Sequence, residues 1–190
     1  MLLQAATELF AIHGYAMTKI EDIAERAGFS KATIYNYFDT KEDLFLALVD
    51  DIFEFIHSGV DDILNQNKSF IETIEEYVDF SFRSLTSNSD FFRIIMMEHY
   101  KFCDDLRDRI PPTVHAGIEG LKSRLFGFFE ANKKYLRKGF DPKDATIVLM
   151  GVVSSFVGEW MWASDEFDLE SKRDLIVDFF LRGVTEKGKG

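Results

Sequence analysis

The sequence has little cysteine, and it lacks a long apolar run. Cys103 is the one cysteine among 190 residues, so no disulfide can form within the chain. This usage is typical of a reducing compartment, and we expect a cytoplasmic protein. No stretch reaches the roughly 18 consecutive apolar residues of a membrane span. The N-terminus does not have the basic region followed by an apolar run that would indicate a signal peptide. We therefore expect no membrane partner.

Basic side chains are also scarce. Lysine and arginine number 22 against 33 acidic residues, and the net charge of −11 argues against a general nucleic-acid binder. Residues 1–41 hold four basic side chains against five acidic ones. Between Arg26 and Lys41, however, the one acidic residue is Asp39, so this short stretch is locally positive. A hydrophobic content of 46% is enough for a core.

Strand patterns and catalytic motifs are missing as well. No segment alternates apolar and polar residues with a period of two, and apolar residues recur at helical spacing throughout. We therefore predict an all-α protein of about nine helices. No glycine-rich phosphate loop, H-E-x-x-H or G-x-S-x-G motif is present, so we expect no enzyme. His99 and Cys103 stand four apart without a second pair, and we predict no metal and no cofactor.

The stretch that begins at Thr18 predicts two short helices joined by a tight turn. Thr18 is a good N-cap and Glu21 follows three residues later, which is the spacing of a capping box. Gly28 then stands where a chain needs a residue free to take positive φ. Ser30 can cap a second helix, which we expect over residues 31–37. This order is typical of a helix-turn-helix unit.

The second of these helices presents a polar and aromatic face without a carboxylate. Such a face can approach phosphates and base edges without repulsion. Asn36 suits adenine and Lys31 suits guanine, so we expect these two at base edges. The alternative is a small helical hairpin with a mixed surface. The outward positions are Lys31, Thr33, Tyr35, Asn36 and Tyr37.

Three linked motifs carry a resemblance to a known family. They are A-x-E-L-F-A-x-x-G-Y from Ala6, T-x-x-x-x-I-A-x-x-A-G-x-S from Thr18, and K-x-T-x-Y-x-Y-F-x-x-K-E from Lys31. In this first quarter the chain resembles the DNA-binding domain of the TetR/AcrR family of transcriptional regulators. The resemblance implies a three-helix helix-turn-helix domain over residues 1–45 and a helical effector-binding and dimerisation domain over residues 46–190.

The resemblance also implies a function and a set of DNA contacts. We expect a ligand-responsive repressor that binds a palindromic double-stranded DNA operator as a homodimer and is released by a small hydrophobic effector. Thr18 would bind phosphate at a helix N-terminus and Lys41 would contact the phosphate backbone. Ala32 and Asp39 depart from the residues usual in the family. The expected DNA-binding residues are Thr18, Lys19, Ser30, Lys31, Thr33, Tyr35, Asn36, Tyr37 and Lys41.

The remaining helices are predicted from their caps and breaks. A long helix from Lys41 to about residue 64 would connect the head to the body. Ser69 with Glu72 repeats the capping-box pattern and opens the next helix. Three further helices are expected over residues 112–138, over 142–163 after the Asp141 cap, and from the Asp168 cap to Gly183.

Two clusters in the body are functional candidates, each with a structural alternative. Small residues spaced by three or four on residues 142–163 predict a dimer interface, with close packing inside one subunit as the alternative. Bulky, adaptable side chains predict an effector pocket, with ordinary core as the alternative. The interface candidates are Gly151, Ser154, Ser155, Gly158 and Phe179; the ligand candidates are Met96, Met97, His99, Phe102, Phe156, Glu159 and Trp160.

A second reading of the whole chain also stands. The acidic balance fits a helical ligand-binding or adaptor protein that no longer binds DNA. The two readings differ in whether the face from Lys31 to Tyr37 is open to a duplex.

Overall fold

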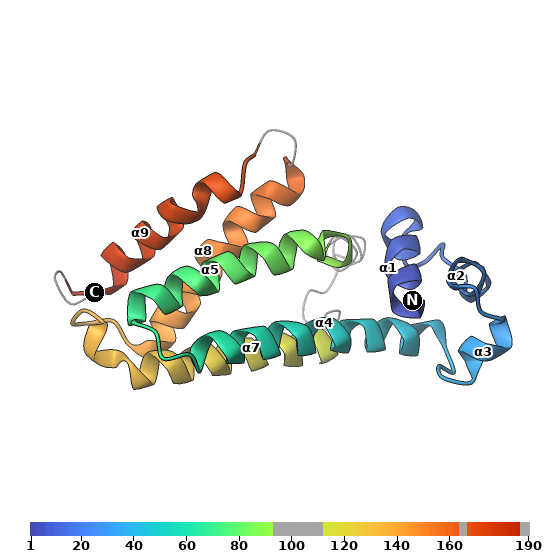
Figure 1. Ribbon diagram of the computed structural model, residues 1–190, viewed down its shortest axis with the longest axis horizontal. Coiled ribbons are helices and arrows are strands. Elements are labelled where there is room, and N and C mark those ends of the chain that lie inside the picture. Colours follow the sequence, from blue (N-terminus) through green and yellow to red (C-terminus); the bar gives the residue numbers. More distant parts are fainter. Residues whose placement is uncertain (93–111, 164–166, 187–190) are drawn as a thin grey trace, which may run out of the picture. The chain divides into compact units, whose positions relative to one another are not determined.

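The structure, a computed structural model, describes residues 1–92, 112–163 and 167–186. In these residues the chain is helical, with no strand and one isolated bridge between Leu136 and Thr185 (Figure 1). This confirms the predicted all-α class. The elements are α1 (Leu2–His13), α2 (Ile20–Ala27), α3 (Lys31–Tyr35), α4 (Lys41–Leu64), α5 (Phe70–Ser87), α7 (Pro112–Ala131), η1 (Lys133–Tyr135), α8 (Pro142–Trp162), η2 (Glu170–Lys172) and α9 (Arg173–Val184).

The chain divides into two compact units. The first holds Met1–Glu54 with the described part of 88–117, and the second holds Phe55–Ser87 with the described part of 118–190. We call the helix-turn-helix part of the first unit the head and the second unit the body. The predicted head, residues 1–45, lies wholly in the first unit, while the boundary after residue 45 stays a prediction.

Helix ends in the head follow local chemistry. Gly28 takes φ 74° after α2, and its N–H donates to the Ala24 and Glu25 carbonyls. The Ser30 hydroxyl accepts the Thr33 N–H at 3.1 Å, so Ser30 caps α3 as predicted. A full capping box opens α4, where Thr40 and Asp43 exchange backbone-to-side-chain bonds of 2.9 and 3.0 Å. The caps at Ser30 and Thr40 place the starts of α3 and α4 where the sequence predicts them.

The core of the head is small and aromatic. The rings of Phe10, Tyr15 and Phe45 meet pairwise with centroids 5.2 to 5.9 Å apart, bringing together α1, the following turn and α4. Ile23 of α2 and Ile34 of α3 are fully buried. Since both short helices bury their apolar residues, their opposite faces are left to solvent.

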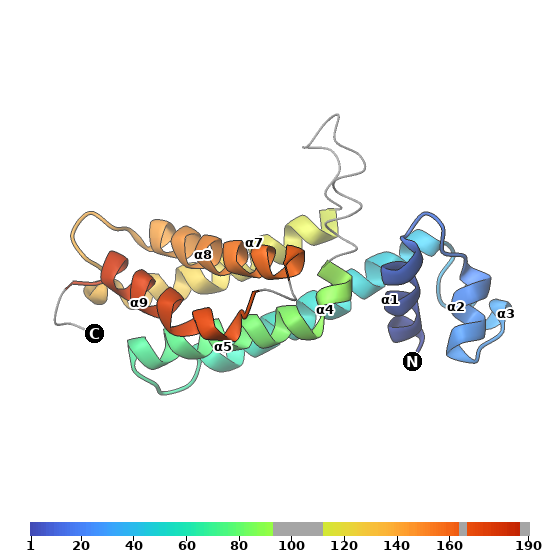
Figure 2. The ribbon, with the colours of Figure 1, turned by 90° about the horizontal axis from the view of Figure 1, so that it is seen from above.

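The body is built by α5, α8 and α9 with parts of α4 and α7, and both views show α8 and α9 side by side (Figure 2). Phe70 stacks between Phe128 and Tyr135, with ring centroids 5.6 and 5.0 Å away. Phe129 and Phe180, both fully buried, meet at 5.9 Å. Tyr77 is also buried, and burial raises the pKa of its hydroxyl to about 12. Aromatic packing thus forms part of the body's core.

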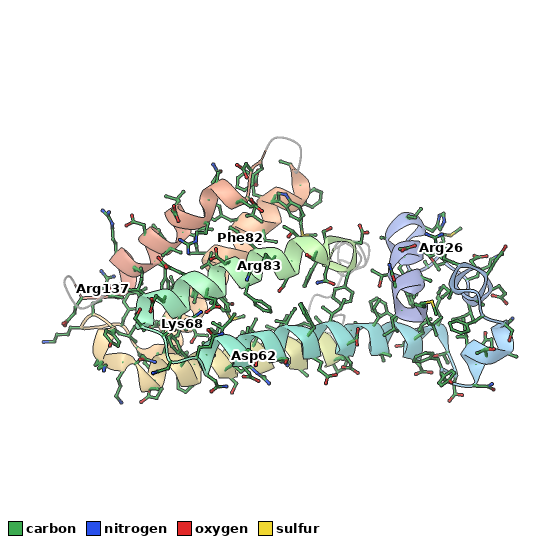
Figure 3. The ribbon with its side chains drawn as sticks, viewed as in Figure 1. Arg26, Asp62, Lys68, Phe82, Arg83 and Arg137 are labelled. Carbon is green, nitrogen blue, oxygen red and sulfur yellow. The ribbon has the colours of Figure 1, made fainter. Side chains whose placement is uncertain are left out.

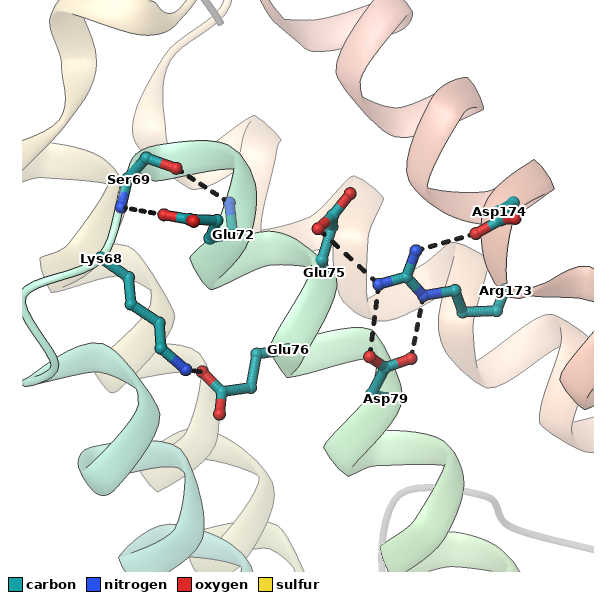
Figure 4. Close-up of polar contacts among 8 residues, drawn as sticks. All are labelled: Lys68, Ser69, Glu72, Glu75, Glu76, Asp79, Arg173 and Asp174. Carbon is teal, nitrogen blue, oxygen red and sulfur yellow. Dashed lines mark hydrogen bonds and ion pairs between the residues drawn. The ribbon is translucent and has the colours of Figure 1, made fainter.

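An arginine bridge joins α5 to α9 in the body (Figure 4). The Arg173 guanidinium donates to both Asp79 carboxylate oxygens at 3.0 and 3.3 Å and to Asp174 at 2.8 Å. The hydrogen bonds that the guanidinium donates to these carboxylates raise the pKa of Arg173 above its ordinary value. Figure 4 also shows the predicted capping box, in which Ser69 and Glu72 exchange bonds of 2.9 and 3.2 Å. The sequence did not reveal the arginine bridge, because its partners lie 94 residues apart.

Three predicted helix limits are wrong. The helix expected over 112–138 ends at Ala131, where Asn132 donates its side-chain amide to the Phe128 carbonyl at 2.9 Å. After η1 the chain runs extended, and the Arg137 N–H donates to the Val184 carbonyl at 2.9 Å. The helix expected over 31–37 ends at Tyr35, and the one expected from Asp168 begins as η2 before α9. Each difference lies at a helix end, where boundaries are least determined by the local sequence, and in the first case a long-range bond from Arg137 to Val184 follows the helix.

Candidate functional site

The outward face of α3 is open to solvent. Tyr37 is 76% exposed and Tyr35 is 42% exposed, and Lys31 and Asn36 are also exposed. Thr33 is half-buried, and its hydroxyl lies 2.7 Å from that of Ser30. Five predicted contact residues in and just after α3 are thus exposed or half-buried, and we call this set the reading face: Lys31, Thr33, Tyr35, Asn36 and Tyr37.

Lys31 has a partner that the sequence did not indicate. Its ammonium group pairs with the Glu21 carboxylate at the start of α2, and it lies 5.5 Å from the centroid of the Tyr35 ring. The bond from Lys31 lowers the pKa of Glu21, and the same bond raises the pKa of Lys31. The cation of the reading face is therefore neutralised inside the head.

The prediction for Thr18 is corrected. Its hydroxyl lies 2.8 Å from the Gly14 carbonyl and 3.1 Å from the Leu9 carbonyl, and its side chain is buried. Helix α2 starts later, at Ile20, with Lys19 as N-cap and no side-chain cap bond. The Thr18 hydroxyl therefore joins α1 to the following turn and does not cap α2, while its predicted phosphate contact stays a prediction.

Lys41 has partners within the head that the sequence did not indicate, and its predicted phosphate contact stays a prediction. Its ammonium group donates to the carbonyls of Tyr15, Ala16 and Thr18 at 2.7, 3.3 and 3.0 Å. It lies 4.4 Å from the centroid of the Tyr15 ring. Three carbonyls and an aromatic face already satisfy this cation, because the turn between α1 and α2 folds over the start of α4. Lys41 is thus a structural clamp of the head.

The other two basic side chains of residues 1–41 differ in their pairing. Arg26 on α2 donates to Glu8 on α1 at 2.6 and 3.0 Å, and Figure 3 places Arg26 beside α1. Lys19 is exposed, and within the described residues no hydrogen bond or ion pair of its ammonium group is found. Among the basic side chains of the head, Lys19 is thus exposed without such a bond, and its predicted phosphate contact stays a prediction.

Three of the five predicted dimer residues line an apolar groove between α8 and α9. The groove has a volume of about 480 Å³, and Gly151, Ser155 and Phe179 line it together with Ile147 and Leu175. Ile147, Leu175 and Phe179 are 54, 55 and 61% exposed. Ile147 and Leu175 were missed by sequence reasoning, although each stands four residues before a predicted member. Ser154 and Gly158 lie on α8 but do not line the groove.

The small residues of α8 do not serve close packing within this chain. A methyl group added at Gly151 or Gly158 would meet no heavy atom within 4 Å in the described residues. At Gly117 on α7, by contrast, an added methyl would lie 2.3 Å from Phe53. The alternative reading of α8, close packing inside one subunit, therefore finds no support at these two glycines.

Helix α8 is apolar enough, by length and composition, to cross a membrane. Its 18-residue window has a mean hydropathy of 1.4, and 28% of that window is buried in the chain. One such helix is weak evidence, since helices of water-soluble cores pass the same test. What the low burial does establish is a large apolar surface left uncovered by the described chain.

The predicted ligand residues are only partly described. Met96, Met97, His99 and Phe102 lie outside the described residues, as does Cys103. Phe156 lines the α8–α9 groove and meets the Phe167 ring at 6.2 Å. Glu159 is exposed and Trp160 half-buried on the same helix. Within the described ranges, no three His, Cys, Asp or Glu side chains are grouped for a metal ion.

A helix-turn-helix head with an open reading face, followed by a helical body, defines a DNA-binding regulator of the one-component kind. Comparisons with known proteins agree. The sequence model described as "Bacterial regulatory proteins, tetR family" matches residues 2–48. Residues 2–48 therefore form a DNA-binding domain of this family, and the chain is a transcriptional regulator, not an enzyme.

Relatives extend the likeness over the whole chain. The fatty acid metabolism regulator protein of Bacillus subtilis is 22% identical over 187 residues, spanning 98% of this chain and 95% of the relative. The crystal structure of FadR from Bacillus subtilis in complex with stearoyl-CoA has a TM-score of 0.80 at 20% identity, covering 96 and 97% of the two chains. The SmeT–triclosan complex has a TM-score of 0.79 at 21% identity, covering 100 and 92%.

Proposed function

We propose that the protein is a cytoplasmic, dimeric repressor that leaves its operator when a long-chain acyl compound binds the body. The observation that carries the DNA-binding part is the open reading face of α3 beside the exposed Lys19. Uncharged and aromatic side chains there can contact base edges and thymine methyls, and Lys19 can neutralise a phosphate.

The dimer has its own physical support. The exposed apolar side chains of the α8–α9 groove cannot remain in water without cost, and a second copy of the chain offers the same surface in return. Two heads are also needed for a palindrome, because one recognition helix spans only a few base pairs. The predicted interface residues Gly151, Ser155 and Phe179 belong to this groove.

The effector class is proposed from relatives. One fold neighbour at a TM-score of 0.80 holds stearoyl-CoA, and the relative with 22% identity is a fatty acid metabolism regulator. A long acyl chain suits a body whose described core combines aliphatic and aromatic side chains. Release of DNA then requires that the acyl compound bind the DNA-free arrangement more tightly than the DNA-bound one.

The test uses the purified dimer and a labelled duplex from beside its own gene. Binding is followed by fluorescence anisotropy, and stearoyl-CoA, stearate, coenzyme A and triclosan are then added separately. We expect stearoyl-CoA or stearate to release the duplex and coenzyme A to have no effect. Release by triclosan alone would replace the acyl class by a broader set of apolar compounds.

The reading face is tested by Asn36→Ala and Tyr37→Ala. Each should weaken operator binding by about tenfold, in line with loss of a base contact. The control is Phe126→Ala, which removes another exposed aromatic ring, from α7. Unchanged operator affinity in both head variants would contradict the assigned face, whereas failure of the unaltered protein to bind any duplex would favour the adaptor alternative.

A further inference from the structure

The ion pair between Lys31 and Glu21 includes a residue of the reading face. Lys31 is the one cation on the reading face, and its partner carboxylate comes from the neighbouring helix of the same head. Both side chains are 52% exposed, so DNA can reach the pair. A duplex that uses Lys31 must therefore compete with Glu21 for the same ammonium group.

We propose that Glu21 is a specificity-determining residue that holds Lys31 as an internal counter-ion and so suppresses binding to random DNA. Any duplex offers phosphates to Lys31, but an operator can also offer a guanine edge with two acceptors. To bind Lys31, a duplex must replace the ion pair with Glu21. Phosphates alone compensate poorly for the loss of this pair, whereas a matched base edge with two acceptors compensates better. This inference rests on the proposed DNA-binding function.

The remaining charges of the head agree with this role. Arg26 is paired with Glu8 and Lys41 is bound by three carbonyls, so Lys19 is left as the open cation of residues 1–41 in the described structure. Most of the sequence-independent attraction to a duplex comes from such cations, since each neutralised phosphate releases counter-ions. With Lys31 also held back, non-specific affinity depends on very few groups.

The pair contributes little to folding. Exposed ion pairs stabilise proteins only slightly, because water and salt screen them and two long side chains lose freedom. Glu21→Gln should therefore leave the folded head intact while releasing Lys31. The side chain keeps its size and can still accept a neutral hydrogen bond, so the change is confined to charge.

The experiment measures the affinity of the full-length chain for its operator and for a random duplex over a range of salt concentrations. Glu21→Gln should raise affinity for the random duplex about two- to fivefold, which matches the strength of an exposed pair. Operator affinity should rise less, so the specificity ratio falls. The slope of log affinity against log salt should steepen by up to about 0.9, the value of one further phosphate contact.

Two controls isolate the mechanism. Glu25→Gln removes an exposed carboxylate one turn further along α2, so it measures the effect of net charge alone. Lys31→Met removes the proposed target, and in that background Glu21→Gln should have no more effect than Glu25→Gln. If Glu21 only stabilised the fold, Glu21→Gln would leave the slope of log affinity against log salt unchanged.

The outcomes are distinct. An excess effect of Glu21→Gln over Glu25→Gln that disappears with Lys31→Met supports the proposal. Equal effects of the two glutamine variants overturn it, and so does an excess that persists without Lys31. If no variant binds any duplex at any salt concentration, the proposed function itself fails, and the inference fails with it.

Discussion

The head and the body differ in what they leave uncovered. In the head, the described cations other than Lys19 are satisfied internally, and the exposed reading face is polar and aromatic. In the body, charges such as Arg173 are paired, but the α8–α9 groove leaves apolar side chains exposed. The head is thus complete in water and can bind and release a polar partner. The exposed apolar side chains in the groove of the body, by contrast, favour lasting contact with another apolar surface.

Two glycines, one in each unit, also differ in what lies beside them, although other glycines of the body, such as Gly59 under Phe80, are closely packed. Gly117 in the first unit lies directly under the Phe53 ring, whereas Gly151 in the body faces open space. A glycine that permits a contact inside the chain is required for that fold. A glycine with nothing near it has no such role in the protomer, and its small size matters only when another surface approaches.

The largest expected effect comes from Phe179→Glu. This places a charge on the exposed α8–α9 groove, where a partner surface would have to desolvate it. We expect the dimer to dissociate and operator affinity to fall by on the order of 100-fold, since paired heads are lost. Mass by light scattering checks the first effect and anisotropy the second.

Its control is Phe126→Glu, which adds the same charge at another exposed phenylalanine that does not line the groove. This variant should remain dimeric. A Phe179→Glu protein that keeps the mass of a dimer would move the interface away from this groove and weaken the contrast between the units.

Lys41→Met tests the head. The methionine keeps the bulk of the stem but loses the bonds to three carbonyls and the contact with the Tyr15 ring. We expect the free energy of unfolding of the head to fall by about 1.5 to 3 kcal/mol, the range for hydrogen bonds to charged groups. Urea unfolding followed by circular dichroism measures it.

Lys19→Met is the matched control for this change. Lys19 is exposed, so its loss should leave the stability of the head within about 0.5 kcal/mol while weakening DNA binding. Equal stability of the two variants would show that Lys41 is not a clamp, and would favour its predicted phosphate contact.

Alanine at the two contrasted glycines sharpens the comparison. At Gly117 the new methyl would lie 2.3 Å from Cγ of the Phe53 ring. We expect this overlap to lower the free energy of unfolding by about 1 to 3 kcal/mol. At Gly151 it meets nothing, so helix propensity should stabilise the protomer by up to about 1 kcal/mol. Both are measured in the Phe179→Glu background, where dimerisation does not contribute.

In the dimeric protein, Gly151→Ala should behave differently. If α8 approaches its partner closely, the methyl weakens the dimer although it stabilises the protomer. Stabilisation of the protomer with an unchanged dimer dissociation constant would show that the open face of Gly151 is not part of the interface.

The smallest expected effect is a pH dependence in the body. The Ser69 N–H donates to the Glu72 carboxylate at 2.9 Å and holds the pKa of Glu72 below its usual value of 4.5. A lowered pKa in the folded state contributes stability above the unfolded pKa, and this contribution is lost as pH falls through the folded value. Glu72→Gln should therefore reduce the loss of stability between pH 5 and pH 3, roughly the span around that pKa.

Thermal unfolding across that pH range measures the effect, with Glu159→Gln as the control. Glu159 is exposed on α8 and caps no helix start. If the two variants lose stability identically as pH falls, the capping carboxylate of Glu72 does not contribute to acid sensitivity.

Local chemistry in the sequence by itself determined most helix starts and the class of the protein. Ser30, Ser69 and Asp141 cap their helices as predicted, because a cap acts on an N–H only three residues away. The outward order of residues on α3 follows from the burial of Ile34, so the reading face could also be predicted. Linked motifs in the first quarter were enough to indicate the family.

Only the tertiary structure decided how the charged side chains are used. Lys31 pairs with Glu21 across the turn, and Lys41 reaches carbonyls 23 to 26 residues earlier in the chain. The Thr18 side chain points inward because the packed turn after α1 places the Leu9 and Gly14 carbonyls beside its hydroxyl. Periodicity gives the face on which a side chain lies, but only the packed chain determines which partner it meets.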